Sequence, residues 1–257
     1  MIIQRPYTID FFDVDRHRNM TFKAMAKAFQ GLATTHSAQV GAGYAVLSKK
    51  GLVWFLHRLK IEVAAFPVLL QDVRLMTWSR GFKGFKGFRE YRIESAAGEA
   101  LVKGSSVWLF YNFKKRRISK VPAEISRCYE FNTQRNFETE LDDWQPRLEF
   151  DPDTGMDISL RYSDFDMNGH VNNTEYIGFL ESLFHGADHP GLSDIKSLKI
   201  RFDREIGREK DRIRVEWQRR KNRCYCRVCD DGSRFAGAEL VLSGNAKGVS
   251  GKSGVQG

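Results

Sequence analysis

Hydrophobic and polar positions follow two patterns along this chain, and the order of the patterns repeats. A helical pattern begins after Thr21, which can cap the helix, and ends near Gly41. Its predicted buried face comprises Phe22, Met25, Ala26, Phe29, Leu32 and Ala33. Other segments alternate with a period of two, as strands with one buried face do. They cover residues 9–14, 52–63, 73–79, 88–95 and 100–113, so the predicted order is strand, helix and antiparallel meander.

The same order begins again after residue 153. A strand is predicted over residues 158–162, and a polar loop then leads into a helix that Asn172 can cap. The buried stripe of this helix is predicted to be Tyr176, Ile177, Leu180, Leu183 and Phe184. Four strands follow at residues 195–202, 212–219, 224–228 and 234–242, with turns at Lys221-Asn222 and Asp231-Gly232.

The two halves also match weakly in sequence. FDVDRHRNMT, which starts at Phe12, aligns with SDFDMNGHVNN, which starts at Ser163, and this places Asp15 over Asp166. The tripeptide LKI occurs in both halves, at residues 59–61 and 198–200. The chain therefore reads as a tandem duplication. A long helix wrapped by an antiparallel sheet, present twice, is an α+β fold of the double hot-dog type.

These patterns predict a division into four parts. Residues 1–125 form an N-terminal hot-dog, and residues 154–242 form a C-terminal hot-dog. Residues 126–153, which are polar and acidic, are predicted to be an inter-domain linker. The tail from residue 243 to 257 is rich in Gly, Ser and Lys and is expected to be disordered.

The charge balance has two interpretations, solubility alone or an acidic partner. The chain of 257 residues carries a formal net charge of +9, which suits nucleic acid, anionic lipid or an acidic protein. No apolar run is long enough to span a membrane and no leader with a cleavage site is evident, so a cytoplasmic location is expected.

Three of the four cysteines form a C-x-C-x-x-C pattern at Cys224, Cys226 and Cys229. No fourth ligand lies near them, and the alternating strand would put Cys229 on the face opposite the other two. Structural cysteines are therefore favoured over a zinc site, and neither a metal nor a cofactor is expected.

The polar loop before the second helix holds the candidate chemistry. Asp166, Asn168 and His170 lie two residues apart, so an extended backbone would project all three side chains to one side. The helix that follows begins at its positive end, which favours a developing negative charge. The alternative is structural: Asp166 and Asn168 are also common turn residues, and a single histidine is more often structural than catalytic.

These residues belong to a block that resembles the acyl-ACP thioesterases of plants and bacteria. Residues 164–181, DFDMNGHVNNTEYIGFLE, are similar to the family's D-x-D-x-N-x-H-V-N-N-x-x-Y-I pattern. Trp54 with Arg58, and residues 105–124, SSVWLFYNFKKRRISKVPAE, resemble the first half of the family. FDREIGRE, residues 202–209, resembles its R-R-E-C-G segment. The resemblance runs from Tyr7 to about Leu242.

This resemblance implies a double hot-dog fold and the catalytic residues Asp166, Asn168, His170 and Glu205. Ile206 stands where the family has a cysteine, so a cysteine nucleophile is not expected at that position. The implied reaction is hydrolysis of a thioester by carboxylate, imidazole and amide groups. Two routes stay open: Glu205 activates water as a general base, or a carboxylate attacks and forms a transient anhydride.

The implied substrate is a fatty acyl group on acyl carrier protein, whose release ends fatty acid synthesis, with the acyl chain in a pocket of the first half. No nucleic acid or membrane partner is expected, and the chain would act as a monomer or homodimer. Rival hypotheses are an acyl-CoA thioesterase and a non-catalytic module that binds lipid or nucleic acid. The tract GFKGFKGF, residues 81–88, interleaves Phe and Lys, but a glycine-rich connection between strands is favoured there over nucleic-acid binding.

Overall fold

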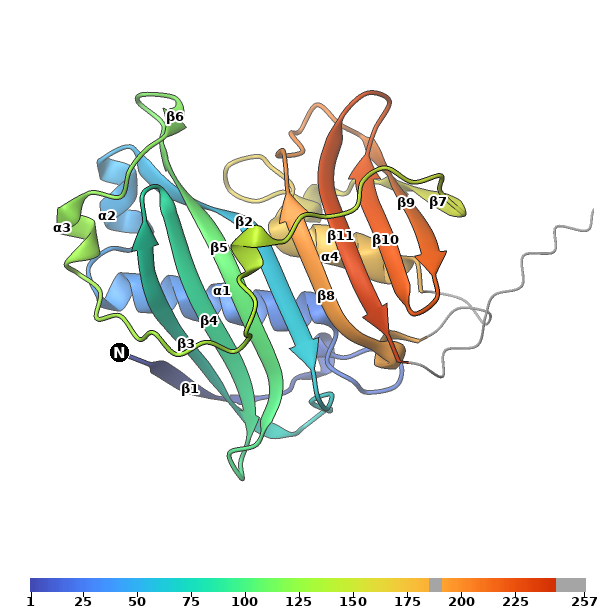
Figure 1. Cartoon of the computed structure of the whole chain (residues 1–257), viewed down its shortest axis with the longest axis horizontal. Coiled ribbons are helices and arrows are strands. Elements are labelled where there is room, and N and C mark those ends of the chain that lie inside the picture. Colours follow the sequence, from blue (N-terminus) through green and yellow to red (C-terminus); the bar gives the residue numbers. More distant parts are fainter. Residues whose placement is uncertain (185–190, 244–257) are drawn as a thin grey trace, which may run out of the picture.

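The protein is a tandem repeat built on one antiparallel sheet (Figure 1). A computed structural model describes residues 1–184 and 191–243. Within them the strands lie in the order β1-β3-β4-β5-β2-β8-β11-β10-β9-β7, and β6 pairs with β5. Read outward from the central β2–β8 pair, the two halves have the same strand order, which confirms the predicted duplication. The predicted tail lies outside the described residues, apart from Ser243.

The strands of the first half are β1 (Ile3–Thr8), β2 (Leu52–Val63), β3 (Asp72–Lys83), β4 (Lys86–Ser95), β5 (Ala100–Asn112) and β6 (Arg117–Ile118). Those of the second half are β7 (Thr154–Ser159), β8 (Ile195–Phe202), β9 (Arg212–Arg220), β10 (Arg223–Cys229) and β11 (Arg234–Leu242). Burial alternates with a period of two most clearly in β9 and β10. In contrast, β11 is buried along most of its length, and the outer strands β1, β6 and β7 have no fully buried residue.

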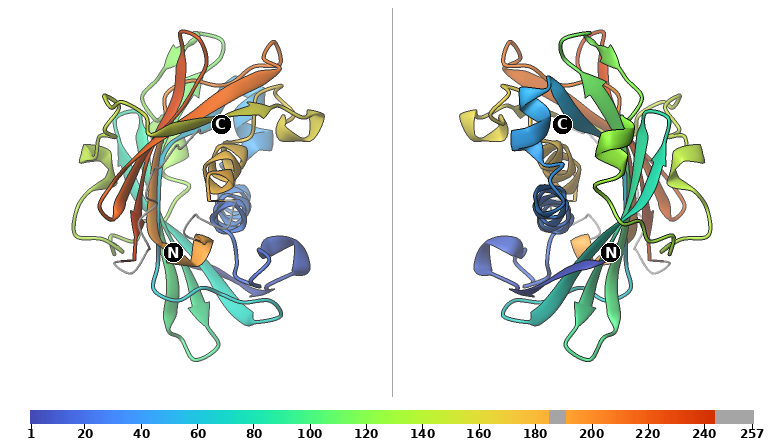
Figure 2. Two further views of the ribbon diagram at one scale, coloured as in Figure 1. Left: turned by 90° about the vertical axis from the view of Figure 1, so that its right-hand side faces the viewer. Right: turned by 90° about the vertical axis from the view of Figure 1, so that its left-hand side faces the viewer.

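Two helices cover the same face of this sheet and lie side by side in both views of Figure 2. They are α1 (Phe22–Gln39), capped by the Thr21 hydroxyl, and α4 (Asn173–Ser182), capped by the Asn172 carboxamide. Both caps agree with the sequence prediction, but α4 is shorter than the long helix expected in the second half. The stripes of both helices pack on the inner sheet face and form the main core.

Two short helices were not predicted from the sequence, α2 (Tyr44–Lys49) and α3 (Ala123–Ser126). Neither is long enough to show a helical period of apolar residues. Within the described residues, none of the helices combines the length and the apolar character that a membrane span requires.

The central pair of strands joins the two halves. Lys60 on β2 lies opposite Lys199 on β8, in the middle of a register that runs from Arg58↔Arg201 to Glu62↔Ser197. These lysines are the middle residues of the two LKI tripeptides. The repeated residues therefore meet each other at the centre of the sheet, as expected around an approximate twofold axis.

The first strand of each half was placed wrongly by the sequence analysis. Residues 9–14 contain a 3₁₀ turn, Phe11–Asp13, while the strand lies earlier at Ile3–Thr8. The predicted strand at 158–162 likewise ends at Ser159, and Tyr162–Asp164 form a 3₁₀ turn. In both turns an aspartate, Asp13 or Asp164, accepts a backbone N–H three residues earlier, and this local bond competes with strand pairing.

The GFKGFKGF tract continues the sheet rather than forming a separate connection. Its outer residues extend β3 to Lys83 and begin β4 at Lys86, so that only Gly84 and Phe85 form the turn. Gly84 has φ of 62°, which glycine adopts without strain. The tract is therefore a hairpin, which is close to the predicted strand connection.

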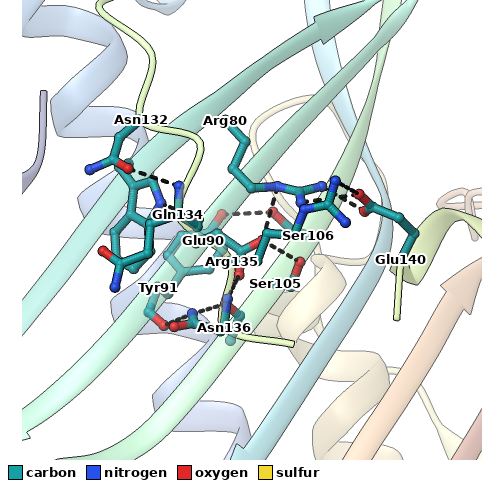
Figure 3. Close-up of polar contacts among 12 residues, drawn as sticks. Arg80, Glu90, Tyr91, Ser105, Ser106, Asn132, Gln134, Arg135, Asn136 and Glu140 are labelled. Atoms are coloured by element: carbon teal, nitrogen blue, oxygen red, sulfur yellow. Dashed lines mark hydrogen bonds and ion pairs between the residues drawn. The ribbon is translucent and has the colours of Figure 1, made fainter. Parts of the chain in front are cut away.

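The segment between the halves crosses the outer face of the sheet, opposite the helices (Figures 1 and 2). We call residues 127–153 the strap. Asn136 donates to the carbonyl oxygens of Tyr91 (2.8 Å) and Gly104 (2.9 Å) and accepts from Arg92 Nε (2.7 Å). Arg80 pairs with Glu140 of the strap and with the buried Glu90 beneath it (Figure 3). The strap is thus fastened to the first half by buried polar contacts.

Replacing Asn136 by alanine is expected to lower the free energy of unfolding by about 2 kcal/mol, because buried carbonyl groups would lose their donors. Urea denaturation measures this loss. Asn132→Ala is the matched control in the same strap, since its side chain accepts only a local bond from the Gln134 N–H. A loss for Asn136→Ala no larger than that for Asn132→Ala would contradict the stabilising role of the Asn136 contacts.

Candidate active site

The loop before α4 is a compact turn closed at both ends. The Asp166 N–H donates to the His170 carbonyl oxygen over 2.7 Å, and the Gly169 N–H donates to the Asp166 carbonyl oxygen over 3.0 Å. Asp166 Oδ1 accepts from the backbone N–H groups of Asn168 (2.8 Å) and His170 (3.2 Å). The carboxylate therefore organises the turn, as aspartate commonly does.

The sequence predicted an extended backbone here, with the side chains of Asp166, Asn168 and His170 on one side. The backbone forms a turn instead, so this prediction is wrong. Asn168 is exposed, and its Nδ2 donates to Asp166 Oδ2 over 3.2 Å. His170 lies at the far side of the turn and contacts a different loop. The structure thus pairs Asp166 with Asn168, and it pairs His170 with Glu205.

The first half contains the same turn with different side chains. Asp15 Oδ1 accepts from the N–H groups of His17 (2.8 Å) and Asn19 (3.0 Å), and the Asp15 N–H donates to the Asn19 carbonyl oxygen. Asn19 therefore occupies the position of His170, as the sequence alignment of the two halves predicted. Arg18 has φ of 66° where Gly169 has 81°.

Gly169 is needed for a second reason. A Cβ atom at this position would lie 2.7 Å from Arg208 Nε, a residue that follows Glu205 on the neighbouring loop. A side chain at position 169 would require the exposed Arg208 side chain to move, which is a weaker constraint than the φ of 81° at Gly169. In addition, His170 forms an isolated antiparallel bridge with Gly207.

Glu205 is held in place by the backbone on either side of it. β8 ends at Phe202, and the next two N–H groups donate to the Phe235 carbonyl oxygen. The buried Tyr176 hydroxyl donates to the Arg204 carbonyl oxygen and accepts from the Ile206 N–H, both over 3.2 Å. The Val171 N–H donates to the Ile206 carbonyl oxygen over 2.9 Å. Glu205 is therefore bracketed by contacts from α4 and from the turn before it.

The role of the Tyr176 hydroxyl was missed by the sequence analysis, which placed the residue only in the buried stripe of its helix. Its ring is indeed buried, at 2 % exposure. A tyrosine at a core position must find hydrogen-bond partners for its hydroxyl, and this requirement was the available signal.

His170 Nε2 lies 3.4 Å from Glu205 Oε2, and the two side chains are 37 % and 48 % exposed. Partial burial raises the pKa of Glu205, the neighbouring His170 lowers it, and the negative charge of Asp166 raises it. The net shift is upward. A half-buried carboxylate with a raised pKa, beside an imidazole, can accept a proton from water.

The side chain of Ile206 is fully buried in the main core and points away from the surface on which Glu205 lies. None of the contacts of Glu205 and His170 described above involves a cysteine. Cys224 and Cys226 are buried on the inner face of β10, and Cys229 lies on the opposite face, as predicted. Burial raises the pKa of the Cys224 thiol to about 12, so it stays protonated.

The first half contains a cavity of about 190 Å³ between α1, α2 and the sheet. We call it the chamber. Most of its wall is apolar or aromatic, and it includes Leu47, Leu52, Trp54, Phe82, Phe88 and Trp108. Trp108 in this wall lies opposite Leu56 of β2. His57, which follows Leu56, contacts the Phe202 carbonyl oxygen of the second half over 3.1 Å. The wall near Trp108 therefore adjoins the junction between the halves.

Two family models match this chain in sequence. The acyl-ACP thioesterase N-terminal domain matches residues 1–129, and the acyl-ACP thioesterase C-terminal domain matches residues 150–243. A chloroplastic palmitoyl-acyl carrier protein thioesterase of Gossypium hirsutum is 25 % identical over 222 residues, which cover 81 % of this chain and 53 % of that protein. The corresponding protein of Arabidopsis thaliana is 27 % identical over 221 residues, with the same coverage. The chain thus spans about half the length of these curated relatives.

Solved structures support the fold. An acyl-ACP thioesterase from Bacteroides thetaiotaomicron superposes with a TM-score of 0.80 at 20 % identity, covering 94 % of this chain and 98 % of the other. The 12:0-ACP thioesterase from Umbellularia californica gives 0.79 at 21 % identity, covering 96 % and 98 %. Together with the two matched models, which cover both halves, these similarities show that the chain belongs to the acyl-ACP thioesterase family and has its double hot-dog fold.

Proposed function

We propose that this protein hydrolyses the thioester of fatty acyl-acyl carrier protein and releases a free fatty acid, with Asp166, Asn168, His170 and Glu205 as its catalytic residues. The observation that carries the proposal is the 3.4 Å pair of His170 and Glu205 on two loops of a chain from this family. A thioester suits such a site, because its thiolate leaves readily. Its hydrolysis therefore needs neither a metal nor a serine nucleophile.

In the proposed reaction Glu205 acts as general base. A water molecule attacks the carbonyl carbon of the thioester and gives one proton to the Glu205 carboxylate. The carbonyl oxygen becomes an oxyanion, which His170 and the positive end of the α4 dipole stabilise. The C–S bond then breaks, the sulfur receives the proton, and a fatty acid and a free thiol leave. Asn168 orients the water or the substrate, and Asp166 holds the turn.

The proposed place for the acyl chain is the chamber of the first half. Trp54 lies three residues before His57 on β2, a span of about 10 Å at the usual rise of a strand. His57 in turn contacts Phe202, three residues before Glu205. An acyl chain whose thioester lies beside Glu205 would thus enter the chamber along β2. This arrangement uses the first half for binding and the second for chemistry.

The surface around Glu205 suits an acidic carrier. Arg204 and Arg208 are exposed on either side of it, and neither forms an ion pair within residues 1–184 and 191–243. With the net charge of +9, these cations favour an anionic partner that delivers a tethered thioester. Acyl-CoA also carries anionic phosphates, so an acyl-CoA thioesterase is the alternative. We place the reaction in the cytoplasm and propose a monomer or homodimer, since one chain already contains paired halves.

Glu205→Gln is expected to lower kcat for acyl-acyl carrier protein by roughly 10²–10⁴-fold, because the amide cannot accept the proton of the attacking water. Release of free thiol from a panel of acyl-acyl carrier proteins and acyl-CoAs measures the effect. His170→Ala should also lower the rate, whereas Asn19→Ala, its counterpart in the first half, should not. Full activity of Glu205→Gln would refute the assigned base, and faster turnover of acyl-CoA would change the assigned partner.

Tyr176→Phe is expected to lower kcat by roughly tenfold while KM changes little, because the loop that carries Glu205 loses both of its bonds to the hydroxyl. Steady-state kinetics separate the two constants. Tyr225→Phe is a suitable control, since Tyr225 packs under Arg147, outside the core. A change in KM alone, or none in either constant, would exclude a positioning role for this hydroxyl.

The rate should fall as the pH decreases, with a midpoint above the ordinary range for glutamate. The reason is that Glu205 must be ionised to act as base and its pKa is raised. Asp166→Asn should shift this midpoint in kcat/KM to lower pH, because it removes a negative charge that raises the pKa. Asp15→Asn, in the equivalent turn, should leave the profile unchanged. If the midpoint did not change in Asp166→Asn, the acidic limb of the pH–rate profile would belong to a group other than Glu205.

A further inference from the structure

Arg89 is a buried cation in the wall of the chamber. The residue is 7 % exposed. Its Nη1 donates to His36 Nδ1 over 2.8 Å and to Thr77 Oγ1 over 3.2 Å. No ion pair joins Arg89 to an acid within residues 1–184 and 191–243. Burial lowers the pKa of the guanidinium, so a charge is kept in an apolar cavity with neutral partners only, which is costly.

The polar groups that remain in this cluster are donors. Arginine only donates, so His36 Nδ1 accepts and the neutral ring carries its proton on Nε2. Burial and the neighbouring Arg89 lower the pKa of His36 to about 4, which keeps the ring neutral at physiological pH. His36 Nε2 is buried without a hydrogen-bond partner among the described residues. The Thr77 hydroxyl gives its proton to the Glu90 carbonyl oxygen over 2.9 Å. The acceptors within this cluster, His36 Nδ1 and Thr77 Oγ1, are thus already used by Arg89 Nη1.

Arg89 lies deeper in the chamber than the junction between the halves. The chamber wall begins near Trp108, whose partner across the sheet is Gly87. Arg89 lies on β4, and β5 separates that strand from β2, so Arg89 is about 10 Å across the sheet from the strand at the junction. Across the sheet Arg89 lies opposite Ser106 on β5, which is a small residue. The donors of Arg89 therefore face the far part of a space that is otherwise mainly apolar and aromatic.

We propose that the chamber selects acyl chains that carry an oxygen acceptor, a hydroxyl or a carboxylate, at the end remote from the thioester, and that Arg89 binds this oxygen. The inference rests on the proposed function for the direction of the chain, with the thioester at Glu205. A chain that ends in a methyl group would cover the guanidinium without pairing it. A distal oxygen supplies the missing acceptor, and a carboxylate also compensates the charge.

Binding of free fatty acids, the products of the proposed reaction, tests this without turnover. Calorimetry on the full chain would compare unsubstituted, ω-hydroxy and α,ω-dicarboxylic acids of equal chain length, over a panel of lengths. The wild type is expected to bind the oxygenated acids at least roughly tenfold more tightly than the unsubstituted acid of the same length. The hydroxy and dicarboxylic arms show whether the favoured acceptor is neutral or anionic.

Arg89→Met removes the donors and keeps the length of the side chain, so it should abolish or reverse this preference. Arg89→Lys retains the charge and should keep part of it, which covers the case in which Arg89→Met fails to fold. Arg92→Met is the matched control. Arg92 lies on the same strand but pairs with the strap, through Asn136, on the opposite face of the sheet; its replacement should leave the preference intact.

The outcomes separate this inference from the proposed function. Equal or tighter binding of the unsubstituted acid by the wild type would overturn the inference, as would a preference that survives Arg89→Met. Absence of binding by any acid would overturn it as well, since the chamber would not hold the chain. If the acids bound with the expected preference and no thiol were released from any acyl-acyl carrier protein, the inference would stand and the proposed hydrolysis would fail.

Discussion

The pairing of β2 with β8 is the contact on which the rest of the molecule depends. Its register sets Lys60 opposite Lys199 and merges two sheets into one. A slip of one residue would turn the apolar face of one half away from the helices, so the register is strongly specified. The same pairing brings α1 beside α4, where Lys23 Nζ meets Glu175 over 2.6 Å and the Lys23 N–H donates to Glu181. Binding and chemistry can therefore be divided between halves that share one core.

The two halves contain the same backbone turn, but the side chains on the turn differ. In both, an aspartate closes a turn before a helix, through Asp15 or Asp166. The side chain at the end of the turn is Asn19 in one half and His170 in the other. The segment that pairs with the turn also corresponds, since the Met20 N–H donates to the Pro67 carbonyl oxygen as the Val171 N–H does to Ile206. The turn is therefore a structural requirement of the repeat, and the acid–imidazole pair is an addition to it.

The duplication, the central strands and both helix caps were predictable from the sequence because they depend on local periodicity and on single capping residues. β2, β8 and β11 begin and end as predicted. The outermost strands, β1 and β7, were misplaced because the Asp13 and Asp164 turns contain strand-like residues held by side-chain bonds. Glu205 was named only through the family resemblance, and its contact with His170 was not predicted, since contacts between distant loops leave no periodic signal. The chamber and the isolation of Arg89 depend on packing among strands far apart in sequence.

The position of Ile206 explains how this site can lack a cysteine next to its acid. Consecutive residues of an extended segment project to opposite sides, and here Glu205 reaches His170 while Ile206 enters the core. The backbone of Ile206 is fixed on both sides by the Tyr176 hydroxyl and the Val171 N–H. A nucleophile at position 206 would reach a substrate only if this segment turned over, which would break both bonds and withdraw Glu205 from His170. In this loop, therefore, the contact of Glu205 with His170 goes together with burial of the side chain at position 206, and the buried isoleucine stabilises that arrangement.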